Sequence, residues 1–278
     1  MDKLSIYKTL AERANQGDLI FPTNVRETIK LKRQLDDPDC HLDQAAKLIA
    51  ADPLLAARAV ALANSVAYRR SASVVTNVRS AVQRLGFRTL ITLLSAMIVR
   101  QMNAQLKNPD LQKIANKLWE HSAHVASLAQ IIAKNVTRVD AETAFFAGIV
   151  HEVGGFYLIS QAETYPGLLE GDSEIWMDYG EKVIGRGVLK ALEVPEAVLH
   201  GVEYLWQGIT NMPPESLGDT LILANDIAPV ASPLESKARL QLQNYTRHID
   251  FEVDDTTLQE ILDETDSETQ SLTQALMT

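Results

Sequence analysis

Three side chains that can bind a divalent metal ion lie in two apolar segments of the sequence. His151 and Glu152 stand in the middle of the run FFAGIVHEVGG, and His121 belongs to the segment LWEHSAHVASL. Imidazole and carboxylate groups suit several divalent transition metals, and such a metal can assist hydrolysis of a phosphate ester. Burying polar groups costs free energy unless each finds a partner. These residues therefore bind a metal, take part in catalysis, or satisfy each other inside a core.

The periodicity around His121 predicts that its side chain faces the core. Apolar residues recur every three or four positions from Leu111 to Val136, which predicts a helix of about seven turns with one buried stripe. His121 lies on this stripe. His124 is about 100° away from Val125 and is expected to face outward.

A second helix should carry His151 and Glu152. The run from Phe145 to Val153 is apolar nearly all round, which is typical of a central helix. Gly154 and Gly155 are expected to weaken or bend this helix, or to let another backbone approach it closely.

Composition excludes several classes of protein. The 278 residues are 46% apolar, so a sizeable core is expected, and the single cysteine, Cys40, allows neither an intrachain disulfide nor a cysteine metal cluster. The net charge of −10 disfavours nucleic acid and anionic membranes as the main partners. We read no signal peptide and no membrane span, so a cytoplasmic protein is expected.

Arginines are concentrated in one third of this acidic chain. We interpret them as solvated helix faces and intrachain ion pairs rather than a nucleic-acid site. A weaker alternative is that the arginine-rich segment holds the phosphates of a nucleotide. The residues concerned are Arg58, Arg69, Arg70, Arg79, Arg84, Arg88 and Arg100.

Helical signals dominate the chain, and the predicted class is all-α. Pro53 suits the first turn of a helix after a break at Asp52. Thr76 or Asn77 is expected to cap the helix that follows, and Gly86 to end it.

The quoted segments resemble a known group. LWEHSAHVASLAQIIAK and AETAFFAGIVHEVGG are similar to the core of the HD superfamily of metal-dependent phosphohydrolases. FPTNVRETIKLKRQLDDPDCHLDQAAKLIAADPLLAARAVALANSVAY and VTNVRSAVQRLGFRTLITLL resemble the HDOD family, the HD-related output domain of bacterial signalling proteins. The resemblance runs from about Leu19 to Trp206. It departs at Pro22, the one proline where the family often has two.

The resemblance implies a degraded metal site. The superfamily's first histidine falls on His121, and its His-Asp pair falls on His151 and Glu152. The later ligand positions fall on Glu181, Tyr204, Leu205 and Asn225, with Asp226 one position beyond, and of these Tyr204, Leu205 and Asn225 are poor metal ligands. No metal or other cofactor is therefore expected. The alternative is one divalent ion on His121, His151 and Glu152.

The resemblance also implies an HD-domain-like helical bundle preceded by an N-terminal helical lobe, with a groove where the two meet. We predict the lobe over residues 1–105, the HD-like core over 106–230, and a C-terminal extension with an acidic tail over 231–278. The expected function is a non-catalytic bacterial signalling module that binds a protein or small ligand. The alternative is a phosphohydrolase with one metal. The tail is interpreted as a solvated helix or, less favoured, a docking segment.

Overall fold

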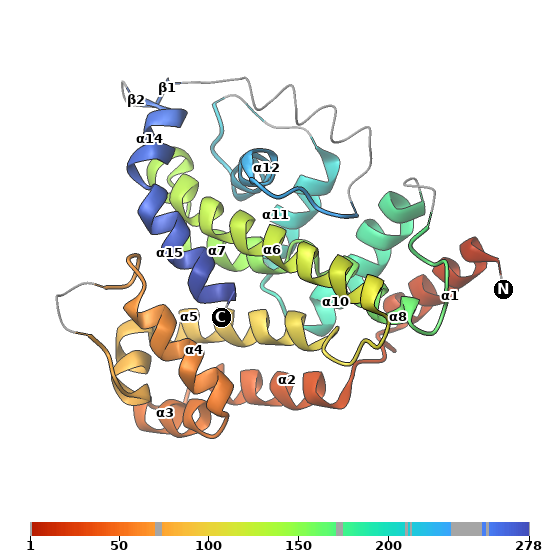
Figure 1. Cartoon of the computed structure of the whole chain (residues 1–278), viewed down its shortest axis with the longest axis horizontal. Coiled ribbons are helices and arrows are strands. Elements are labelled where there is room, and N and C mark those ends of the chain that lie inside the picture. The colour runs from red at the N-terminus through yellow and green to blue at the C-terminus, as the bar shows by residue number, and fades with distance from the viewer. Residues whose placement is uncertain are drawn as a thin grey trace.

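The chain folds as an all-α protein, as the sequence predicts, apart from one short pair of strands (Figure 1). The computed structural model describes residues 2–69, 74–170, 175–208, 211, 213–234, 252–253 and 256–277. Arg70 and most of the connection between residues 234 and 256 lie outside the described residues.

The first five helices come from the predicted N-terminal lobe. They are α1 (Lys3–Gln16), α2 (Thr23–Leu35), α3 (Leu42–Ala50), α4 (Pro53–Asn64) and α5 (Val78–Gln101). The helical segments of the predicted core are α6 (Pro109–Ile132), η1 (Ala133–Thr137), α7 (Ala141–Val150), α8 (Val153–Ala162), η2 (Trp176–Gly185), α10 (Arg186–Ala191), α11 (Glu196–Gln207) and α12 (Leu217–Ile227), of which η1 and η2 are π-helical.

The C-terminal part holds β1 (Glu252–Val253), β2 (Thr256–Thr257), α14 (Leu258–Glu264) and α15 (Asp266–Met277). The two strands pair antiparallel, with Glu252 opposite Thr257 and Val253 opposite Thr256.

Local sequence signals set several of these boundaries. The Asp52 carboxylate accepts hydrogen bonds from the backbone N–H groups of Leu54 and Leu55, and Pro53 occupies the first helical position of α4. Asn77 caps α5 in the same way. Gly86 interrupts α5 with a left-handed φ of 74°, a conformation that glycine adopts without steric cost. The predicted cap at Asn77 and the break at Gly86 are confirmed.

Helix α6 runs through the middle of the molecule and positions the candidate site. It packs against α7, α12 and α15, and Figure 1 shows it crossing the centre of the fold. The stretches Val78–Gln101 and Ala141–Ala162 are long and apolar enough to cross a membrane, but 67% and 83% of their most apolar windows are buried inside the fold. These apolar helices are the buried core of a soluble helical domain.

A carboxylate joins the predicted lobe to the predicted core. Glu142, at the start of α7, accepts hydrogen bonds from the Tyr68 hydroxyl at 2.9 Å and from Thr89 Oγ1 of α5 at 2.9 Å. Gln130 of α6 also donates to Glu142, at 3.3 Å. Burial, together with the nearby Glu142, raises the pKa of Tyr68, which therefore stays a neutral donor.

Both ends of the described chain pack onto distant helices. α1 lies against η2 and α10, where the absent side chain of Gly187 lets Ala14 come close. α15 lies against α6 and α4, with Leu272 fully buried. Its Thr273 hydroxyl donates to Ser127 Oγ of α6 at 3.0 Å. The interpretation of this terminal helix as solvated is wrong, because its apolar face completes the core.

Candidate metal centre

His151 lies where α7 ends against α6. Its Nδ1–H donates to the carbonyl oxygen of Gly148 at 2.7 Å, since a carbonyl can only accept. That oxygen would accept from the backbone N–H of Glu152 if the α-helix continued. Glu152 instead takes φ −103° and ψ 17°, outside the helical region, and is the N-cap residue that precedes α8. The predicted continuous helix to Val153 is therefore wrong, and the break falls on the two polar residues.

His121 is fully buried on α6, as the apolar stripe predicts. Its Nδ1–H donates to the carbonyl oxygen of Val230 at 2.7 Å, just beyond the end of α12. A backbone carbonyl on Nδ1 fixes both the tautomer and the orientation of an imidazole, as is typical of metal-binding histidines. The same kind of bond therefore orients both rings of the site.

The two rings meet through their second nitrogens. His121 Nε2 and His151 Nε2 lie 3.3 Å apart, with ring centroids at 5.3 Å. Because each Nδ1 carries its proton toward a carbonyl, the neutral form of each ring presents a lone pair at Nε2. Two lone pairs at this separation repel unless a proton or a cation lies between them. The arrangement therefore favours a shared proton or a metal ion.

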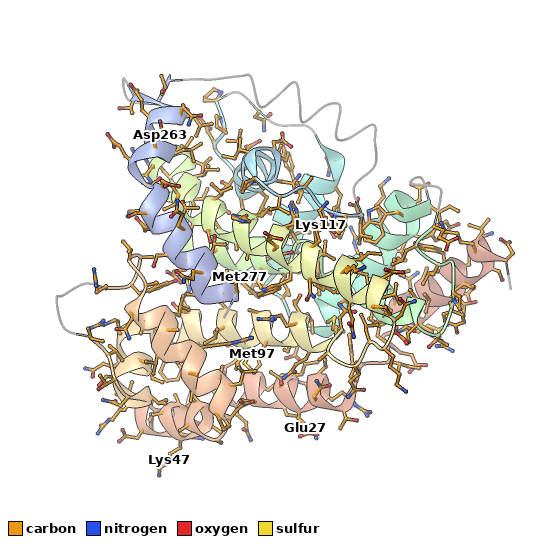
Figure 2. The ribbon with its side chains drawn as sticks, viewed as in Figure 1. Glu27, Lys47, Met97, Lys117, Asp263 and Met277 are labelled. Carbon is orange, nitrogen blue, oxygen red and sulfur yellow. The ribbon has the colours of Figure 1, made fainter. Side chains whose placement is uncertain are left out.

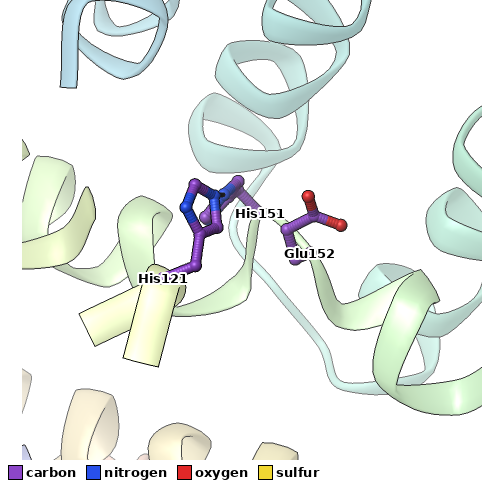
Figure 3. Close-up of side chains that lie close together, drawn as sticks. All are labelled: His121, His151 and Glu152. Atoms are coloured by element: carbon purple, nitrogen blue, oxygen red, sulfur yellow. Dashed lines mark hydrogen bonds between the residues drawn. The ribbon is translucent and has the colours of Figure 1, made fainter. Parts of the chain in front are cut away.

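Glu152 supplies the third donor. One ligand atom from each of His121, His151 and Glu152 lies within 4.8 Å of the other two, and both histidines are buried while Glu152 is half-buried (Figure 3). Two imidazoles and one carboxylate are a known set of protein ligands for zinc, and they suit other divalent transition metals. The residues present therefore fit one divalent ion.

Among the remaining predicted residues, the carboxylates of Glu181 and Asp226 are not part of this group. Glu181 on η2 and Asn225 on α12 are buried, and Asp226 is half-buried. Within the part of the chain that the structure describes, only His121, His151 and Glu152 bring metal-binding atoms together. Tyr204 and Leu205 stand on α11, where Leu205 is core and the Tyr204 hydroxyl accepts from Asn211 Nδ2 at 2.9 Å.

The glycines after Glu152 allow a close approach, as one of the two sequence interpretations expects. A Cβ on Gly154 would lie 2.8 Å from Gly185 Cα and 2.9 Å from the carbonyl oxygen of Gly180. Real Cβ atoms do not approach backbone atoms so closely, so α8 and η2 pack through glycine. This contact holds η2 and its Glu181 beside the segment that carries the candidate ligands.

His124 is half-buried rather than outward-facing. Burial lowers its pKa and the nearby His121 lowers it further, against the opposing effect of Glu120. The cover comes partly from α14 and α15, which line a cavity together with His124. Nothing in the periodicity of α6 indicates that a helix from the far end of the sequence lies there.

The chain matches a known protein family and is similar to solved structures. Residues 21–174 match the HDOD domain. A crystal structure from Shewanella amazonensis SB2B, named "Putative metal-dependent phosphohydrolase", is 24% identical with a TM-score of 0.70, over 97% of this chain and 99% of that one. No curated protein matches the chain.

Two further solved structures share the fold. The "HDOD domain protein with unknown function" from Geobacter sulfurreducens is 22% identical, with a TM-score of 0.57 over 96% of each chain. The "Putative signal transduction protein" from Marinobacter aquaeolei VT8 is 18% identical, with a TM-score of 0.57 over 100% of this chain and 67% of that one. At these identities the likeness concerns the fold alone.

Proposed function

Because this chain belongs to the HDOD domain family, we propose that it is a non-catalytic signal-transduction module of a bacterial cytoplasm. It acts by binding a protein partner or a small ligand. The name of the similar Marinobacter protein refers to signal transduction, which supports this reading. The family match covers α2 to α5 and the segment that carries His121, His151 and Glu152, but not α1.

One observation carries the proposal: the metal-binding group among the described residues is limited to three side chains. A two-metal phosphodiesterase site clamps both the attacking and the leaving oxygen, and it needs more ligands than two imidazoles and one carboxylate. Tyr204, Leu205 and Asn225 stand at positions where the superfamily resemblance implies ligands. Leu205 offers no ligand atom, and its side chain is part of the core.

A specific observation favours a second candidate, a phosphohydrolase with one metal. The 3.3 Å between His121 Nε2 and His151 Nε2 is about the separation of two nitrogens that bind one tetrahedral zinc at roughly 2.0–2.1 Å. A divalent ion there would supply Lewis-acid chemistry toward a phosphate ester. His121 and His151 would hold it through Nε2, and the Glu152 carboxylate would be the third ligand. The name of the similar Shewanella protein agrees with this alternative.

Hydrolysis assays separate the two candidates. The purified full chain is tested with bis-p-nitrophenyl phosphate and cyclic dinucleotides in the presence of manganese, magnesium, nickel or iron(II). The non-catalytic proposal expects no turnover above that of the double variant His121→Ala, His151→Ala. Turnover that this double variant loses would establish the one-metal enzyme instead.

A further inference from the structure

A cavity between the predicted lobe and the predicted core carries two arginines. It has a volume of about 370 Å³, within the range of small-ligand sites. Helices α4 and α5 form one side and α6 and α8 the other. Arg58 comes from α4, Arg100 from α5, Trp119 from α6 and Phe156 from α8. A ligand here would touch both parts of the fold at once.

Arg58 is the most unusual residue of the cavity. Its side chain is only 7% exposed, and its Nε is buried without a hydrogen-bond partner. No carboxylate of the described residues forms an ion pair with it or with Arg100. A buried charge without a partner is strongly unfavourable. By contrast, Arg79 pairs with Asp43 and Arg88 with Asp140.

Arg100 adds a second positive charge to the same space. Its guanidinium lies 5.5 Å from the centre of the Trp119 ring, and its Nη1 donates to the carbonyl oxygen of Met277 at 3.4 Å. Burial lowers the pKa of Arg58, and the charge of Arg100 lowers it further against the weaker effect of Asp52. Two guanidinium groups that line one cavity without a carboxylate partner among the described residues are a site for an anion.

The other residues that line the cavity indicate which kind of molecule carries the anionic group. Met97, Trp119 and Phe156 give an apolar wall, and Figure 2 shows Met97 on α5. Asn103 donates through Nδ2 to the carbonyl oxygen of Phe156, while its buried Oδ1 has no partner. That oxygen can accept a hydrogen bond from a ligand hydroxyl or N–H. The site thus combines an anion position, an apolar wall and one acceptor.

We propose that this cavity binds a phosphate-bearing small molecule of mononucleotide size, with its phosphate on Arg58 and Arg100. Planar guanidinium groups bind phosphate oxygens through paired hydrogen bonds, which suits them to this task better than lysine. The inference rests on the proposed function, because it names the class of small ligand that the signalling module takes. It also gives the ligand a means to act, since the cavity is lined by helices from both the predicted lobe and the predicted core.

Titration calorimetry tests the proposal with three phosphate probes: pyrophosphate, guanosine monophosphate and cyclic di-guanosine monophosphate. Citrate serves as the carboxylate comparison. We expect saturable one-to-one binding of at least one phosphate probe. Arg58→Met and Arg100→Met should each weaken it at least about tenfold, since each variant loses its charge-assisted hydrogen bonds to the phosphate. Lys117→Met removes an exposed positive charge from α6 and should change the Kd less than about twofold (Figure 2).

Arg100→Lys keeps the charge, and with it the fold, but loses the planar fork, and it should also weaken binding. It decides the matter if Arg58→Met does not fold. Three results would each overturn the proposal. They are no saturable heat with any of the three phosphate probes, equal binding by the wild type and the folded arginine variants, and tighter binding of citrate than of the phosphate probes. The titrations are repeated with His151→Ala, which alters the metal centre but not the cavity. Hydrolysis that depends on His151 would refute the proposed non-catalytic function, whereas phosphate binding in the cavity would be judged from the titrations alone.

Discussion

Gly148 of α7 lies directly on Ala126 of α6, so close that a Cβ on Gly148 would overlap the Ala126 backbone. This contact brings α7 near enough for His151 to meet His121. It also leaves the carbonyl oxygen of Gly148 within reach of the His151 ring, and it accepts a hydrogen bond from Nδ1–H at 2.7 Å. Helix packing through one glycine therefore sets the geometry of the candidate metal centre.

Gly148→Ala should lower the free energy of unfolding by about 1–3 kcal/mol, the usual cost of overpacking a core. Urea unfolding followed by circular dichroism measures the change. Because the nearest atoms are the Cα and N of Ala126, adding Ala126→Gly should not restore the loss. Full rescue by that second change would show that the contact is between side chains only.

If the one-metal alternative holds, the full chain should bind about one divalent ion, and His151→Ala should abolish its uptake. Plasma mass spectrometry on protein prepared without chelators or a histidine tag measures the content. His200→Ala is the matched control, because His200 is exposed on α11 and pairs with Glu196 at 3.2 Å. Metal retained by His151→Ala would place the ion elsewhere.

Asp219 should make α12 sensitive to acid. Burial acts to raise the pKa of its carboxyl, but hydrogen bonds from Ser216, Asn211 and Glu215 outweigh burial and lower that pKa overall. Its contribution is therefore fully present above the unfolded pKa of about 3.9, and is lost as the pH falls through the lower folded pKa.

Asp219→Asn should destabilise the protein by about 0.5–2 kcal/mol at pH 7, since it weakens the capping box in which Asp219 accepts from the backbone N–H and the hydroxyl of the N-cap residue Ser216. The difference from wild type should shrink as the pH approaches 3 in urea unfolding experiments. Asp178→Asn, which breaks an exposed pair with Lys182, should cost about 0–1 kcal/mol at most. A difference between wild type and Asp219→Asn that stays constant with pH would contradict the assignment.

Tyr68→Phe should loosen the junction at Glu142. The hydroxyl donates to Glu142 at 2.9 Å and accepts from Gln130 Nε2 at 3.3 Å, so its loss leaves two polar groups short of a partner. We expect a cost of about 1–3 kcal/mol in chemical denaturation. Tyr165→Phe, at a half-buried position, is the control and should be nearly neutral.

Leu272→Ala tests the docking of α15. This side chain is fully buried against the core, so its truncation should cost about 2–5 kcal/mol. Met277→Ala, on the same helix but 40% exposed, should cost much less. Equal small effects in thermal unfolding would mean that α15 does not stabilise the domain.

The sequence predicts those parts of the molecule that depend on local signals. The cap at Asn77, the break at Gly86 and the inward direction of His121 follow from residue type and spacing along one helix. The helix end at His151 does not, because it depends on a side chain that takes the Gly148 carbonyl. The covering of His124 also escapes prediction, because it comes from helices more than 130 residues away in the sequence.

The arginine cavity shows the same limit. Arg58 and Arg100 stand out as part of a basic segment, but the missing counter-charge is visible only when α4, α5 and α6 are assembled. Trp119 and Asn103 carry no sequence signal for ligand binding at all. Pairing of charges in space, rather than their density along the chain, distinguishes a site from a solvated surface.

The packing of the chain ends makes this helical protein hard to divide. α1 lies on η2 and α10, and α15 lies on α6 and α4. Each end of the described chain therefore packs across the boundary between the predicted lobe and the rest of the chain, near residue 105. Either fragment of a chain cut there would expose apolar surface that its missing helices normally cover. The molecule should therefore melt in one cooperative transition. A ligand that binds either part should raise the melting temperature of both parts together.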